Sequence, residues 1–134
     1  YGKQQADYGI NTDKMRWLMR AFRDLPMNVV FILGETKDKD NGGSVTIVPD
    51  LTPKLRESLY PMMDVVVYMY NTTGAVGDGT EHPEGPLKRI LLTSPAYPQY
   101  KTKDRSGAME GFMVDKTLPH ILKAMADKIA ASNA

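Results

Sequence analysis

The sequence predicts an α/β fold in one domain or part of one, with parallel strands flanked by helices and an antiparallel hairpin at the edge. Two runs, residues 27–33 and 65–70, predict the parallel strands because they are rich in β-branched and apolar residues, as in strands covered on both faces. Apolar residues at helical spacing before, between and after these runs predict the helices. With 134 residues, the chain has room for at most one core.

Composition excludes several kinds of site. The net charge of +1 gives no broad attraction for nucleic acid, so a DNA contact needs a local patch. The absence of cysteine excludes disulfides and thiolate metal sites, and His82 and His120 lie too far apart in sequence for a good zinc site. No run approaches the roughly 18 apolar residues of a membrane span. We therefore expect no metal site, no membrane partner and a cytoplasmic protein.

The first half of the chain predicts a helix-strand-helix-strand core over residues 11–70. Residues 1–10 are polar and without period, so we expect a tail, after which Asn11 or Thr12 caps a helix. The helix has one apolar stripe and ends at Pro26. The stripe residues are Met15, Leu18, Met19 and Phe22.

Turn and cap signals divide the rest of the core. Asn41-Gly42-Gly43 and the alternating run at residues 45–48 predict a hairpin or loop over residues 37–50. Thr52 caps a second helix with Pro53 in its first turn and Leu55 and Leu59 on its inner face.

The second half predicts three further segments. Residues 71–86 form a polar, glycine-rich loop, and residues 87–107 form an edge hairpin in which 89–93 pairs with 99–103. Thr117 caps a C-terminal helix over residues 117–131. Its apolar side consists of Leu118, Ile121, Leu122, Met125 and Ile129.

The sequence contains no phosphate-binding loop. Such a loop follows the pattern G-x-x-x-x-G-K-[ST], and no segment matches it. We therefore expect the chain alone neither to bind nor to hydrolyse a nucleotide. Because it begins at Tyr1, we also expect it to be part of a longer protein.

The most distinctive segment is Lys103-Asp104-Arg105-Ser106-Gly107. Lys103 and Arg105 are two residues apart, so at an extended strand end they project to one side and can present two cations to one anion. The alternative is a solvated strand terminus in which Asp104 lies between two bases.

Three segments of the chain resemble the RecA-like P-loop ATPases of phage recombination, the nucleotide-binding and strand-annealing group. They are this K-x-R-x-G segment, the helix start Leu51-Thr52-Pro53-Lys54-Leu55, and the string Met-Arg-x-Leu-x-Arg-Ala-Phe-Arg-x-Leu-Pro at residues 15–26. The resemblance covers the C-terminal half of that domain. It implies a protein that binds ATP and Mg²⁺ when complete, assembles with itself in a ring or filament, binds single-stranded DNA and needs the missing N-terminal half. The location implied is the cytoplasm of a phage-infected or prophage-carrying bacterium.

The resemblance also implies roles for five residues. Lys103 and Arg105 would reach across a subunit interface to the γ-phosphate held by the neighbour. Glu35 would sense the γ-phosphate, although a charged residue leaving a strand also simply marks where solvent begins. Lys37 and Lys39 would contact DNA phosphates, with an ordinary hairpin as the alternative because Asp38, Asp40 and Asp50 dilute their charge.

The remaining candidates favour packing. Met15, Met19, Met62, Met63 and Met125 fall on inner faces, and Tyr97 and Tyr100 could stack on a base but more often pack. A second hypothesis for the whole chain is a non-catalytic RecA-shaped binding or assembly domain. The resemblance also implies that a strand lying between residues 27–33 and 64–70 in RecA-like sheets is missing here. We therefore expect open apolar edges that recruit other strands, or a rearranged sheet.

Overall fold

The structure is a computed structural model that describes residues 2–73, 86–93 and 98–133, with side chains from residue 9 onward. The chain divides into two compact units, Tyr1–Met63 and Asp64–Ala134. Each unit has its own elements, and each is described by itself.

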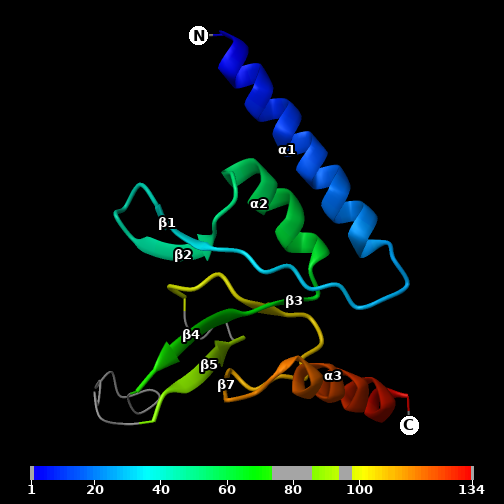
Figure 1. The fold of residues 1–134 in the computed structure, drawn as a ribbon. Helices are drawn as coiled ribbons and strands as arrows, with labels where there is room; N and C mark the ends of the chain where they lie inside the picture. The colour runs from blue at the N-terminus through cyan, green and yellow to red at the C-terminus, as the bar shows by residue number, and fades with distance from the viewer. Residues whose placement is uncertain (1, 74–85, 94–97, 134) are drawn as a thin grey trace. The chain divides into compact units, whose positions relative to one another are not determined.

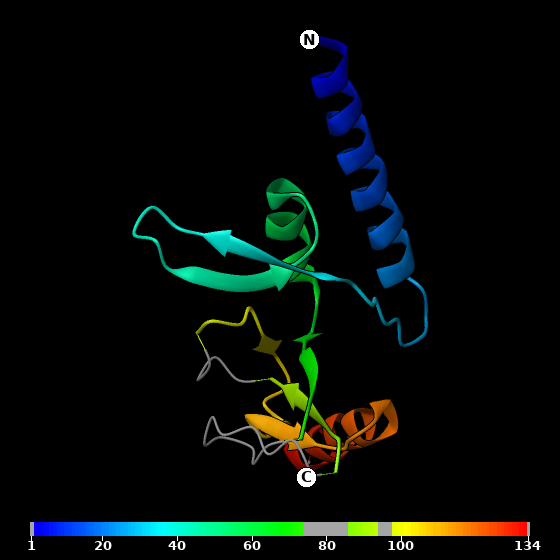
Figure 2. The ribbon, with the colours of Figure 1, turned by 60° about the vertical axis from the view of Figure 1, so that its left-hand side comes forward.

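The first unit packs two helices and a hairpin. Helix α1 (Gly2–Arg23) contacts helix α2 (Pro53–Leu59), which is followed by the short 3₁₀ helix η1 (Tyr60–Met62). Strands β1 (Glu35–Lys39) and β2 (Val45–Pro49) form an antiparallel hairpin, and α2 lies between it and α1 (Figures 1 and 2). Met19, Leu55 and Leu59 form the core. Burial of these side chains stabilises the unit by the transfer of apolar surface from water.

Several predictions for this unit are confirmed. The hairpin lies where the turn signal predicts it, and Leu55 and Leu59 are the buried residues of α2. Pro53 occupies the first turn of α2, but the Thr52 side chain makes no capping hydrogen bond. Of the apolar stripe on α1, only Met19 is buried.

Two predictions for this unit are wrong. Helix α1 begins at Gly2, so residues 2–10 are helical rather than a tail; lysine, glutamine and alanine in this stretch are good helix formers. Residues 27–33 form no strand, and Ile32 is 90% exposed rather than buried. A strand needs hydrogen-bonded neighbours, and no described strand pairs with this segment.

The second unit contains two small sheets and a helix. Strand β5 (Lys88–Leu92) lies between β4 (Tyr68–Thr72) and β7 (Phe112–Val114), and both pairs are antiparallel. Strand β3 (Val65–Val66) pairs with β6 (Lys103–Asp104), also antiparallel. Helix α3 (Leu118–Ser132) follows β7. The central strand β5 is buried most deeply, with Ile90 fully buried and Leu91 and Leu92 nearly so.

The predicted pairing of this unit is wrong, although its segments are mostly in place. The run at residues 65–70 divides at Val67 into β3 and β4, and its side chains are half-buried or exposed rather than covered on both faces. Residues 89–93 pair with β4 and β7 instead of 99–103, because the β4 and β7 edges satisfy both sides of β5. The predicted C-terminal helix at 117–131 is confirmed as α3.

The fold is therefore mixed α/β, with antiparallel pairing throughout the described strands. The parallel pairing predicted from buried apolar runs is absent from these residues. Most of the polar loop at residues 71–86, and Pro95 and Tyr97 of the predicted edge hairpin, lie outside the described residues. None of the described helices is long and apolar enough to cross a membrane.

Candidate functional site

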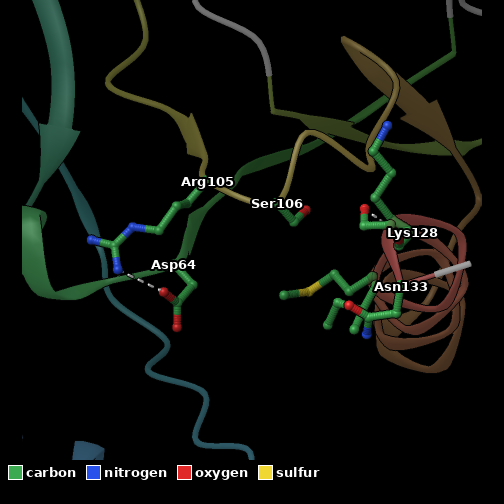
Figure 3. A pocket seen from close by; sticks show the side chains of 8 residues that line it. Asp64, Arg105, Ser106, Lys128 and Asn133 are labelled. Atoms are coloured by element: carbon green, nitrogen blue, oxygen red, sulfur yellow. Dashed lines mark hydrogen bonds and ion pairs between the residues drawn. The ribbon is translucent and has the colours of Figure 1, made fainter.

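The K-x-R segment lies at the end of β6. Lys103 pairs with Val66 across the β3–β6 ladder, and Arg105 extends that ladder because its backbone amide donates to the carbonyl oxygen of Asp64 at 2.8 Å. The guanidinium Nη1 of Arg105 also donates to Oδ1 of Asp64 at 3.0 Å (Figure 3). Both side chains of this ion pair are more than half exposed, at 56% for Arg105 and 66% for Asp64.

Asp104 organises the turn that follows β6. Its Oδ1 accepts hydrogen bonds from the backbone amide of Ser106 at 2.9 Å and from the Ser106 hydroxyl at 2.5 Å. Its Oδ2 accepts from the backbone amide of Met109 at 3.0 Å, and the Ser106 hydroxyl accepts from the amide of Ala108 at 3.2 Å. Gly107 has a φ of +61°, in the left-handed region where a residue without Cβ is favoured.

These hydrogen bonds favour the charged form of Asp104. Partial burial works to raise the pKa of its carboxyl group, but hydrogen bonds from the Ser106 side chain and from the amides of Met109, Ser106 and Gly107 outweigh burial and hold this pKa below its usual value. Asp104 is therefore a carboxylate at neutral pH, and it is engaged by its own turn.

A shallow pocket of about 440 Å³ adjoins this turn (Figure 3). One wall consists of Asp64, Arg105 and Ser106, and the other is the C-terminal part of α3. The lining residues from α3 are Met125, Lys128, Ile129, Ser132 and Asn133. Helix α3, which carries the cation of Lys128, therefore lies beside the turn that follows β6.

The other predicted site residues lie in the first unit, on the β1–β2 hairpin. Asp38 on β1 binds Nη1 of Arg56 on α2 at 2.9 Å, so this face of the strand is turned toward α2. Because side chains alternate along a strand, Glu35, Lys37 and Lys39 share the opposite face. All three are exposed.

Two carboxylates near these lysines have structural partners. Asp38 binds Arg56, and Oδ1 of Asp40 accepts from the amides of Gly42 at 2.9 Å and Ser44 at 2.8 Å. The charge of Asp38 is thus compensated on the far face, and that of Asp40 is used by the turn. The lysines and the K-x-R segment belong to different compact units.

The packing interpretation of the aromatic and methionine residues is confirmed in part. Tyr100 stacks on Tyr68 with ring centroids 4.3 Å apart, whereas Tyr97 lies outside the described residues. Met19 is buried, Met62, Met63 and Met125 are half-buried, and Met15 is exposed. Among the described residues, no three acidic or histidine side chains form a group that could hold a metal ion.

Residues 1–106 match the AAA domain family. The chain belongs to this AAA domain family. No curated protein and no solved structure shows significant similarity to the chain. The match indicates a nucleotide-binding, P-loop ATPase type of domain.

The part of the chain that matches the AAA domain family includes every predicted site residue. It runs from α1 through the hairpin to Ser106, and so contains Lys103 and Arg105 but neither β7 nor α3. Sequence reasoning did not identify Asp64 as the partner of Arg105, or Asp104 as the hydrogen-bond acceptor that closes the turn after β6. The signal for Asp104 was present, since an aspartate two residues before a serine and three before a glycine is typical of a side-chain-closed turn. Nothing in the sequence indicated that Asp64 meets Arg105.

Proposed function

We propose that this AAA domain is the C-terminal portion of a RecA-like, ATP-dependent protein of phage DNA recombination or strand annealing. In this proposal Lys103 and Arg105 act in trans on the γ-phosphate of a nucleotide held by a neighbouring copy. The proposed partners are further copies of the protein in a ring or filament, single-stranded DNA, and an N-terminal half that holds ATP and Mg²⁺. The proposed setting is the cytoplasm of a bacterium that carries the phage.

The arrangement of Arg105 is the observation that supports this proposal most strongly. Its backbone is held by a hydrogen bond to Asp64, while its guanidinium is at the surface in an exposed ion pair. An exposed pair contributes about 0–1 kcal/mol, so a phosphate can replace the Asp64 carboxylate at small cost. A fixed backbone with an exchangeable side-chain partner suits a group that must reach a neighbour's nucleotide.

The residues of this chain fit only part of a nucleotide site. They offer cations for phosphate oxygens, but the sequence has no G-x-x-x-x-G-K-[ST] loop, and the described residues hold no metal-binding group. ATP and Mg²⁺ would supply a phosphoryl group and charge neutralisation when bound by the other half. The role of this chain is then to stabilise charge that develops on the γ-phosphate.

The hairpin supports the proposed contact with DNA. Lys37 and Lys39 lie on the exposed face opposite α2, whereas Asp38 is turned toward Arg56. Two cations about 7 Å apart along one face of a strand can contact phosphates of one DNA strand together. We propose that Glu35, on the same face, responds to the γ-phosphate.

Steady-state hydrolysis by the complete ATPase tests the proposed function. Arg105→Ala should lower kcat by on the order of 10³-fold or more while leaving nucleotide affinity nearly unchanged, because such a group acts on the transition state. Arg89→Ala, at an exposed position on β5, is the matched control and should retain activity. An unchanged kcat for Arg105→Ala in an assembled ATPase would instead make the K-x-R segment a solvated strand terminus that takes no part in hydrolysis.

Salt-dependent binding to single-stranded DNA tests the hairpin. The double variant Lys37→Ala/Lys39→Ala should weaken binding to all sequences and reduce the salt slope by about 0.7 for each phosphate that the protein no longer neutralises. An unchanged slope would assign the hairpin a structural role only.

A further inference from the structure

Arg105 is held on both sides of its position in the chain. On its N-terminal side, β6 pairs with β3, and the amide of Arg105 continues that ladder to the Asp64 carbonyl oxygen at 2.8 Å. On its C-terminal side, the turn at residues 106–109 is closed by the side chain of Asp104, which directly precedes Arg105 in the chain. The starting point of the Arg105 side chain is therefore set by two independent structures.

The Asp104 contacts are those of an organising group. Both carboxylate oxygens are used, one by Ser106 and the other by the amide of Met109. The Ser106 hydroxyl relays the interaction, because it donates to Asp104 and accepts from the amide of Ala108. Removal of the carboxylate would leave several amides of one short turn without their acceptor, which favours rearrangement of the turn.

We propose that Asp104 is a positioning residue for Arg105: its carboxylate closes the turn at 106–109 and thereby sets the direction in which Arg105 leaves β6. This inference rests on the proposed function, since the position of Arg105 affects hydrolysis only if Arg105 reaches a nucleotide. Asp104 itself touches no phosphate in this proposal. The negative charge of Asp104 agrees with this positioning role, because an ionised carboxylate can accept hydrogen bonds at both of its oxygens.

Kinetics of the complete ATPase test this inference. Asp104→Ala should lower kcat by on the order of 10²-fold, the effect of a displacement of about 1 Å, with KM for ATP nearly unchanged. Asp104→Asn should give an intermediate kcat, because its amide oxygen still accepts from Ser106 but its nitrogen cannot accept from Met109. Asp127→Ala removes an exposed carboxylate on α3 and should leave kcat at the wild-type value.

A double variant separates positioning from a merely structural role. If Asp104 acts through Arg105, then Asp104→Ala should lower kcat no further once Arg105→Ala is present. Multiplication of the two losses would overturn the inference.

Amide hydrogen exchange of the full chain gives a readout that does not depend on hydrolysis. Asp104→Ala should accelerate exchange at Ser106 and Met109, and Asp127→Ala should not. Unchanged exchange at both amides would overturn the inference. If Arg105→Ala leaves kcat unchanged, the proposed function fails instead, and exchange alone then decides whether Asp104 closes the turn.

Discussion

Asp64 contacts Arg105 twice, through its carbonyl oxygen to the Arg105 backbone amide at 2.8 Å and through Oδ1 to the guanidinium at 3.0 Å. The two contacts differ in what they fix. The backbone contact extends the β3–β6 ladder and does not depend on either side chain. The side-chain contact lies at the surface, where water and salt weaken it. Asp64 thus holds the backbone of Arg105 firmly and its cation loosely.

Removal of the Asp64 carboxylate should have little effect on the stability of the fold. Asp64→Ala keeps the backbone hydrogen bond and removes only an exposed ion pair, so the free energy of unfolding should fall by less than about 1 kcal/mol. Urea unfolding in low and high salt measures this, and the small difference should shrink further in high salt. A loss of several kcal/mol would mean that the pair has a structural role.

Arg56 should matter more to stability than Asp38, its partner. Arg56 is only 16% exposed and donates from Nε to the carbonyl oxygen of Leu51 at 3.1 Å as well as to Asp38. Arg56→Ala should lower the free energy of unfolding by about 1–3 kcal/mol, because it removes a largely buried side chain and leaves the Leu51 carbonyl oxygen without this donor. Asp38→Ala keeps the hydrogen bond to Leu51 and should cost less. Equal losses in urea unfolding would contradict this account of how α2 supports the hairpin.

The apolar segment at residues 27–33 should promote self-association. Ile32 is 90% exposed and Val30 is 56% exposed, and no described strand pairs with the segment. Sedimentation velocity should show association that increases with protein concentration, and Ile32→Lys should reduce it. Met69→Lys, at a residue of β4 that is 58% exposed, is the matched control and should change association much less. Equal effects of the two substitutions would show that general hydrophobicity, not this segment, drives association.

Asp104 should make stability depend on pH in acid. The pKa of its carboxyl group is lowered in the folded state, so Asp104 contributes stability that is fully present above its unfolded pKa of about 3.9 and is lost as the pH falls through the folded pKa. The difference in unfolding free energy between wild type and Asp104→Asn should be constant from pH 7 to about pH 5 and shrink below about pH 4. A difference that instead grows on acidification would contradict the hydrogen-bonded carboxylate.

Local signals in the sequence predicted local structure well. The turn at Asn41-Gly42-Gly43, the proline at the start of α2 and the apolar spacing of α2 depend on neighbours along the chain, and each is found where predicted. Strand pairing depends on what lies beside a strand, and here the sequence misled. Apolar runs at 27–33 and 65–70 are typical of covered parallel strands, yet the first has no strand partner among the described residues and the second divides between two antiparallel sheets. The Asp64–Arg105 contact was unpredictable for the same reason, since it joins residues 41 positions apart.

A subunit-mixing experiment tests the central claim, that Arg105 acts on a nucleotide held by a neighbour. Subunits of the complete ATPase with Arg105→Ala keep their nucleotide site, and subunits with a disabled phosphate loop keep Arg105. If Arg105 acts in trans, a mixture of the two should hydrolyse ATP faster than either variant alone, because some interfaces then join an intact nucleotide site to an intact Arg105. A mixture no faster than the sum of its two inactive components, in assemblies shown to contain both, would contradict the claim.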